Sequence, residues 1–293
     1  MDSTNPTWRF KQPGWLASWR AGLPYYRLPP TLMARVGYAS LRGRQRDLRR
    51  DVDELIAGTY PAPVVVGLEH VPRTGRCVIV ANHYERPDGA WVGWGAIVIT
   101  AALAHHRPGA PAARWVMTST WADCYFGPRR IAPERLHGIL QRFAAVYGVI
   151  LMPASDLESA GRAVALRSLF RALDADAEAV VALHPEAGGF ETMIVPPPGA
   201  GRVLAALERR DVPLLPVGVS EQDGRLTVRF GPALAPGVLR GLSDSLAAAT
   251  VMETIAELVP PETRGAFGDS SPSGPHPASG PARPAEVLAP EVG

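Results

Sequence analysis

The stretch that decides the fold runs from Cys77 to Asp88 and reads Cys-Val-Ile-Val-Ala-Asn-His-Tyr-Glu-Arg-Pro-Asp. Its first five residues form a continuous apolar run, which is typical of a strand that is buried on both faces. The chain then becomes polar and leaves the strand just before His83. Pro87 suits the first turn of a helix, because a proline there sacrifices no helical hydrogen bond. We therefore expect the next helix over 88–105.

The rest of the chain repeats this alternation of short apolar runs and helical stretches. Further strands are expected at 63–67, 115–118, 148–152, 179–183, 214–219 and 226–230, and further helices at 132–145, 156–173, 200–209 and 244–258. In the helix 156–173, a stripe at helical spacing is expected to face the core, namely Ala163, Leu166, Phe170 and Leu173. Apolar strands between helices predict an α/β fold with a mostly parallel or mixed central sheet flanked by helices.

Composition divides the chain into three parts. Of 293 residues, 46% are apolar and 20% charged, which excludes a chain that is disordered throughout. Residues 1–57 are predicted to be a basic, aromatic-rich helical segment, and residues 58–265 an α/β domain. Residues 266–293 are rich in Pro, Ser, Gly and Ala and are predicted to be a disordered tail. The two cysteines suit a reducing compartment rather than a disulfide framework.

The N-terminal part carries most of the positive charge. The whole chain has a net charge of +2, yet residues 1–50 hold ten basic and two acidic groups, a balance of +8. We expect one or two short helices over 14–50, interrupted by Pro29 and Pro30. Aromatic rings mixed with arginines favour a segment that lies on an anionic membrane surface. The alternative is a helical hairpin packed on the main domain with a solvated basic face.

A run of eighteen uncharged residues, 89–106, is long enough to be considered as a membrane-spanning helix. It contains three glycines and ends in His105 and His106, and it follows a buried strand after only a short loop. A core helix of the α/β domain is the interpretation that we favour.

His83 and Asp88 together suggest acid–base chemistry. A histidine just after a strand lies at the carboxyl edge of the sheet, where α/β proteins bind ligands. An aspartate five residues later is near enough to orient one ring nitrogen, which leaves the other free to accept a proton from a hydroxyl. Seen alone, the spacing is equally compatible with a loop histidine that only packs.

Several blocks along the chain occur in a fixed order around this pair. They are Gly67-Leu-Glu-His-Val-Pro72, the strand with Asn82-His83-x4-Asp88, His184-Pro185-Glu186-Ala187-Gly188, Val212-Pro-Leu-Leu-Pro-Val217 and Val228-Arg-Phe-Gly-Pro-Ala-Leu234. In this order, over about residues 63–260, they resemble the glycerolipid (lysophospholipid) acyltransferase family, 1-acylglycerol-3-phosphate acyltransferase-like, with its His-x4-Asp motif. The third block resembles that family's Phe-Pro-Glu-Gly. The resemblance implies the glycerolipid acyltransferase fold and an acyltransferase domain over 58–265.

The chain departs from the family pattern at two places. Ala154 stands where the family has an arginine associated with the acceptor's phosphate, and Gly188-Gly189-Phe190 stands where another arginine often follows. A planar guanidinium is the natural clamp for a phosphate. The sequence therefore leaves the acceptor open, and Arg86, Arg162 or Arg167 could bind its phosphate in place of the absent arginines.

The resemblance implies a phospholipid-biosynthesis enzyme, an O-acyltransferase that moves a fatty acyl group from acyl-CoA or acyl carrier protein to a hydroxyl of a lysophospholipid or related glycerolipid. His83 would be the general base, oriented by Asp88. Neither a cofactor nor a metal is expected, and nucleic acid is not an expected partner. The expected location is cytoplasmic, peripheral at the inner face of the cell membrane. The alternatives are an inactive lipid-binding homologue and an acyl-thioester hydrolase. The residues expected to bind substrate are Asn82, Arg86, Pro185, Glu186, Gly188 and Arg162.

Overall fold

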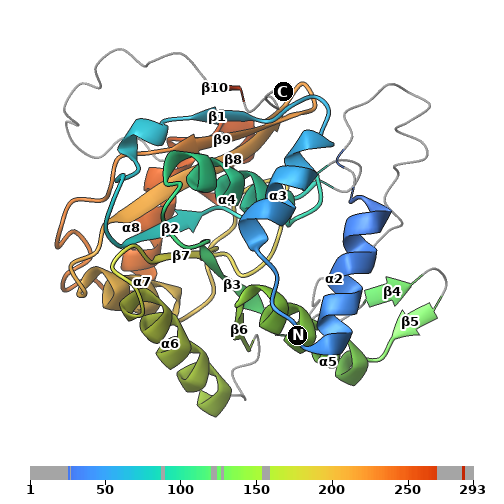
Figure 1. The fold of residues 1–293 in the computed structure, drawn as a ribbon. Helices are drawn as coiled ribbons and strands as arrows, with labels where there is room; N and C mark the ends of the chain where they lie inside the picture. Colours follow the sequence, from blue (N-terminus) through green and yellow to red (C-terminus); the bar gives the residue numbers. More distant parts are fainter. Residues whose placement is uncertain are drawn as a thin grey trace.

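The computed structural model describes residue 26 and residues 28–86, 90–119, 124–126, 129–153, 159–268 and 286–287. Its helices are α2 (Pro30–Arg42), α3 (Leu48–Ala57), α4 (Trp94–His106), α5 (Pro133–Tyr147), α6 (Ser159–Asp174), α7 (Ala200–Glu208) and α8 (Asp244–Ala256). Its strands are β1 (Val64–Val66), β2 (Cys77–Ala81), β3 (Arg114–Thr118), β4 (Cys124–Phe126), β5 (Arg129–Ile131), β6 (Ile150–Met152), β7 (Val180–Leu183), β8 (Leu214–Gln222), β9 (Arg225–Phe230) and β10 (Glu286–Val287). Figure 1 shows their arrangement.

One mixed sheet forms the centre of the molecule. Among the described residues it has eight strands in the order β10-β1-β9-β8-β2-β7-β3-β6, and β4 and β5 form a separate antiparallel hairpin. The neighbours β8, β2, β7, β3 and β6 run parallel to one another, whereas β9 is antiparallel to β8. This confirms the predicted fold class. The carboxyl ends of β2, β7 and β3 therefore meet at one edge of the sheet, where a site is expected in such folds.

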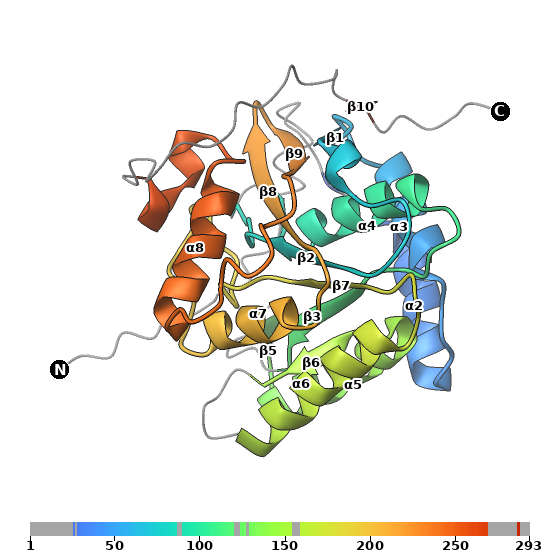
Figure 2. The same ribbon diagram turned by 90° about the vertical axis from the view of Figure 1, so that its left-hand side faces the viewer.

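Helices cover both faces of this sheet, as Figures 1 and 2 show. Side chains alternate along β2, so Ile79 packs in one core cluster and Val78 and Val80 pack in the other. The first cluster includes residues of α2, α3 and α4, and the second includes residues of α6, α7 and α8. Burial on both faces explains why β2 and β7 are continuous apolar runs in the sequence.

The predicted helix over 88–105 is wrong at its start, because α4 begins only at Trp94. The chain after β2 stays extended instead: Glu85 donates its backbone N–H to the carbonyl of Phe190 (3.0 Å), and Phe190 donates to the carbonyl of His83 (2.9 Å). The carbonyl of Ala90, which in a helix over 88–105 would accept from Trp94, accepts instead from Arg86 (3.0 Å), and Trp94 donates to the carbonyl of Trp91 (2.9 Å). Pro87 and Asp88 lie outside the described residues.

The uncharged run 89–106 contains α4, which is buried in the core along most of its thirteen residues. This agrees with the core-helix interpretation and not with a spanning helix. In the part of the chain that the structure describes, every helix is too short or too polar to cross a bilayer.

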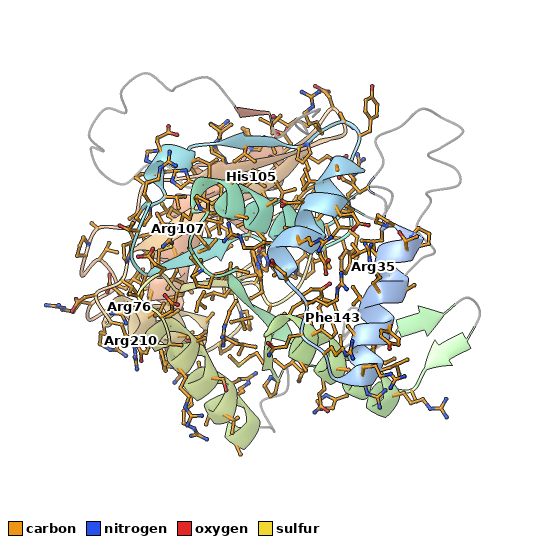
Figure 3. The ribbon with its side chains drawn as sticks, in the orientation of Figure 1. Arg35, Arg76, His105, Arg107, Phe143 and Arg210 are labelled. Carbon is orange, nitrogen blue, oxygen red and sulfur yellow. The ribbon has the colours of Figure 1, made fainter. Side chains whose placement is uncertain are left out.

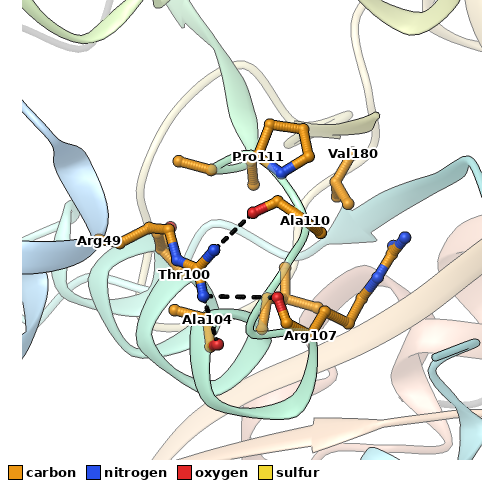
Figure 4. A pocket seen from close by; sticks show the side chains of 10 residues that line it. Arg49, Thr100, Ala104, Arg107, Ala110, Pro111 and Val180 are labelled. Atoms are coloured by element: carbon orange, nitrogen blue, oxygen red, sulfur yellow. Dashed lines mark hydrogen bonds between the residues drawn. The ribbon is translucent and has the colours of Figure 1, made fainter. Parts of the chain in front are cut away.

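The described N-terminal helices pack on the domain. Helix α2 starts at Pro30, where a proline in the first turn costs no helical hydrogen bond. Arg49 of α3 donates to the carbonyls of Ala104 (2.7 Å) and Ala110 (2.5 Å), which ties α3 to the end of α4 (Figure 4). Asp51 accepts two hydrogen bonds from Arg46 and one from the hydroxyl of Tyr147 on α5. Residues 1–25 lie outside the described residues.

Other predicted boundaries shift for local reasons. The strand over 148–152 begins two residues late, because Gly148 ends α5 in the left-handed conformation (φ 68°). The predicted stripe on α6 is only partly right: Leu173 is buried and Ala163 is exposed, while Ala165 and Leu169, outside the stripe, are buried as well. The predicted start of this helix, residues 156–158, lies outside the described residues.

The C-terminal part also differs from the prediction in two details. Phe267 is buried in the core, two residues beyond the predicted end of the domain. Glu286–Val287, within the segment predicted to be disordered, pair with β1 as an antiparallel strand. The rest of residues 269–293 lies outside the described part of the chain.

Buried and paired arginines hold the edge of the sheet opposite the site. Arg107 donates to the carbonyl of Gly75 (2.6 Å) and to the carboxylate of Glu178 (2.7 Å), beside the start of β2. Arg76 and Arg210, which lie close together in Figure 3, both pair with the carboxylate of Asp174 at the end of α6. These arginines have structural partners, and none of them is one of the predicted phosphate clamps.

Candidate active site

His83 lies at the carboxyl edge of the sheet, two residues after the end of β2. Its backbone is held on both sides: its carbonyl accepts from Phe190, and its N–H donates to a carboxylate oxygen of Glu186 (2.5 Å). The residue as a whole is partly exposed, but Nδ1 is fully buried and has no hydrogen-bond partner among the described residues. The backbone bonds fix His83 at the edge of the sheet where α/β folds bind ligands.

The environment of His83 keeps its imidazole neutral. Burial and the neighbouring His184 lower the pKa of His83 well below 6.5, and the backbone of Gly188 only partly opposes this shift. A neutral imidazole has a free lone pair, which is the form required of a general base. An unpaired buried nitrogen is costly unless a partner satisfies it. Asp88, the predicted partner, lies outside the described residues, so that pairing stays a prediction.

Asn82 is almost completely buried, with 2% of its surface exposed. Its side-chain amide donates to the carbonyl of Val219 (2.9 Å), and its oxygen accepts from the N–H of Val219 (2.7 Å). The backbone pairing of β2 with β8 ends at Ala81 and Val217. The amide thus continues the ladder through a side chain while the backbone turns away toward His83. The predicted substrate contact of Asn82 stays a prediction.

Glu186 lies beneath His83, with 4% of its surface exposed. One carboxylate oxygen accepts from the N–H of His83 and the other from the N–H of Ile194 (2.9 Å). Burial raises the pKa of Glu186 to about 7, against the lowering effect of these two donors. The carboxylate therefore joins the loop after β7 to the loop after β2. A contact with the acceptor's polar head, as predicted, remains a prediction.

His184 is the site residue that sequence reasoning missed. It immediately follows β7, and its ring is stacked on that of His83, with centroids 4.1 Å apart and planes inclined by 11°. On its other side it stacks on Trp115 of β3, at 5.1 Å and 22°. The only signal in the sequence was that a histidine occupies the position of the family's phenylalanine.

The remaining predicted site residues are placed as follows. Arg86 pairs with the buried Glu221 (2.6 Å), and its Nε has no hydrogen-bond partner within the described residues. Arg162 is on α6, and its Nε donates to the carbonyl of Pro153 after β6 (3.3 Å). Pro185 is buried beside His184, and Gly188 contacts His83 through its backbone. Ala154 lies outside the described residues.

Metal binding finds no support in the described part of the chain, where no group of three or more His, Cys, Asp or Glu residues is suitable for an ion. Cys77 is a free thiol inside β2, and burial raises its pKa to about 11. A thiol in that state is a core residue and not a nucleophile.

The fold and the site define an α/β protein with a neutral histidine at the carboxyl edge of a mixed sheet. No protein-family model matches the sequence, and no curated protein sequence matches it. Among solved structures, the chain is similar to the 1-acyl-sn-glycerophosphate (LPA) acyltransferase PlsC from Thermotoga maritima, with 13% identity and a TM-score of 0.45, over 83% of this chain and 85% of that chain. A likeness at this level carries no activity and no site residue over to this chain.

Proposed function

We propose that the chain is an acyltransferase that moves a fatty acyl group from acyl-CoA or acyl carrier protein to a hydroxyl of a lysophospholipid or related glycerolipid. The observation that carries this proposal is His83: a neutral imidazole at the carboxyl edge of the sheet, with a buried Nδ1 that is unpaired among the described residues. It is the histidine of the Asn82-His83-x4-Asp88 block, around which the other blocks keep the family order.

In the proposed reaction, His83 removes the proton of the acceptor hydroxyl through Nε2 as the hydroxyl oxygen attacks the thioester carbonyl. A carbon–oxygen bond forms, the carbon–sulfur bond breaks, and the proton passes from the imidazolium to the departing thiolate. Asp88 accepts a hydrogen bond from Nδ1 and stabilises the imidazolium while it exists. The N–H of Arg86 donates to the carbonyl of Ala90 (3.0 Å), so the two described residues that flank 87–89 are bonded to each other.

Arg86 is the arginine best suited to contact a phosphate of the acceptor. Its side chain is 39% exposed, although Nε is buried without a partner among the described residues and one terminal nitrogen is bound to Glu221. A guanidinium can serve a carboxylate and a phosphate together because it has five donors. The function of Glu186 in this scheme is to hold the backbone of His83 in place.

We further propose that the protein binds the cytoplasmic face of an anionic membrane through α2. That helix exposes large apolar side chains, with Leu41 exposed by 73%, Tyr38 by 53% and Met33 by 46%. Arg42 lies over the ring of Tyr38, at 5.4 Å from its centroid. Sedimentation with anionic liposomes should weaken as salt is added, and Leu41→Asp should weaken it further. Equal binding to neutral and anionic liposomes would contradict the electrostatic part.

Mass spectrometry of lipid products tests the proposed activity. The enzyme is incubated with acyl-CoA or acyl carrier protein donors and a panel of lysolipids, and His83→Ala serves as the inactive control. We expect an acylated lipid that appears only with the wild-type protein. Release of CoA without any lysolipid would instead indicate a thioesterase. Lipid binding without turnover of any donor would indicate a non-catalytic lipid-binding protein.

A further inference from the structure

Three aromatic rings from neighbouring strands are stacked in a row at the site. His83 follows β2, His184 follows β7, and Trp115 belongs to β3, which lies on the far side of β7. Trp115, at the end of the row, is fixed by hydrogen bonds. Its indole N–H donates to the hydroxyl of Thr100 on α4 (2.9 Å), and that hydroxyl donates to the carbonyl of Ala96 (2.7 Å). The middle ring, His184, has no role in the proton transfer proposed above.

Hydrogen bonds define the tautomer of His184. Its Nδ1 lies 3.0 Å from the carbonyl oxygen of Ala81 and 3.2 Å from that of Asn82. Carbonyl oxygens only accept, so Nδ1 must carry the proton and donate it. Burial lowers the pKa of His184 to about 4, so the ring is neutral near neutral pH. The ring is thus anchored to the two residues that precede His83.

We infer that His184 is a positioning residue for the proposed reaction: its flat ring, backed by Trp115, sets the plane in which His83 presents its lone pair. The inference rests on the proposed role of His83 as general base. Because the ring of His184 is stacked 4.1 Å from the imidazole of His83, that imidazole cannot rotate about its side-chain bonds without a clash. A misplacement of about 1 Å at such a group costs up to about 100-fold in rate.

Two variants separate the flat ring from the hydrogen bond. His184→Phe and His184→Leu both lose the Nδ1 donor and both fill the space between His83 and Trp115, but only phenylalanine keeps a flat plate. We expect kcat of the leucine variant to be about 10- to 100-fold below that of the phenylalanine variant, with KM values that differ less than about threefold. Thermal unfolding establishes that both variants are folded.

Titration of His83 by NMR provides a readout that needs no turnover. With leucine at position 184, the His83 ring becomes mobile and better hydrated, so its pKa should rise toward 6.5, whereas phenylalanine should leave it low. Glu186 lies under the backbone of His83 in both variants and therefore cancels in the comparison.

Equal kcat values and equal His83 titrations in the two folded variants would overturn the inference. Full activity of His83→Ala would overturn the proposed general base instead, and the titration would still report whether position 184 controls the ring of His83. The control variant is His105→Ala, which replaces an exposed histidine and should change neither kcat nor the titration of His83.

Discussion

Replacing Asn82 by alanine should destabilise the protein because two buried hydrogen bonds disappear together. The amide of Asn82 bonds both the carbonyl (2.9 Å) and the N–H (2.7 Å) of Val219, and Asn82 is only 2% exposed. Each buried backbone group left without a partner costs about 1–3 kcal/mol. We therefore expect Asn82→Ala to lower the free energy of unfolding by about 2–5 kcal/mol, which corresponds to about 5–15 °C in Tm.

Urea unfolding followed by tryptophan fluorescence measures this change. Gln141→Ala is the matched control, because it removes an exposed amide on α5 and should stay within about 0.5 kcal/mol of wild type. If Asn82→Ala were as stable as Gln141→Ala, the amide would not be the continuation of the β2–β8 ladder that we describe.

The variant Asn82→Asp separates the two bonds, since it keeps the acceptor for the N–H of Val219 and replaces the donor. A buried carboxylate facing a carbonyl holds its proton longer than the same group in the unfolded chain. Its folded pKa is then raised above about 3.9, so stability falls as pH rises above that value. A variant whose stability relative to wild type is the same at pH 4 and pH 8 would contradict this placement.

Two further predictions concern the scaffold. Gly201→Ala should lower the free energy of unfolding by about 2–3 kcal/mol, because its Cβ would lie 1.9 Å from the carbonyl oxygen of Asp244. Gly138→Ala on α5, where no described atom lies within 4 Å of the new Cβ, should instead raise the free energy of unfolding by up to about 1 kcal/mol. Urea unfolding of the two variants checks this, and equal effects would refute the close approach of α7 and α8. Asp51→Asn should cost about 2–4 kcal/mol at pH 7 by weakening its bonds to Arg46. Although burial alone would raise it, these hydrogen bonds bring the pKa of Asp51 below its usual value, so the difference from wild type should shrink as pH falls below about 4, and an undiminished difference at pH 3 would contradict the ion pair.

The strands of the core could be predicted because burial on both faces leaves a plain mark in the sequence. The run Cys77–Ala81 was predicted with the bounds that the structure has, and the apolar run at 179–183 contains β7. The start of α4 could not be predicted in the same way. The chain before α4 is held by backbone bonds that the local pattern does not contain, between Arg86 and Ala90 and between the loop after β2 and Phe190, which is more than a hundred residues away in sequence.

The candidate site shows the same division. His83 and Glu186 were predicted as site residues, and the structure joins them by a hydrogen bond. The importance of His184 was missed, because its stacking depends on β7 lying between β2 and β3, and this strand order is a long-range property that no local pattern contains. The pairing of His83 with Asp88 stays a prediction, since Asp88 lies outside the described residues.

Thiol release from acyl-CoA in the presence of the productive lysolipid tests the central claim most directly. The neutral imidazole of His83 is proposed to take the proton of the acceptor hydroxyl, and removing a general base of this kind lowers rates by about 10²–10⁴-fold. We predict a loss of that size in His83→Ala and an unchanged rate in His105→Ala. Release of CoA by His83→Ala as fast as by the wild-type enzyme would contradict the claim.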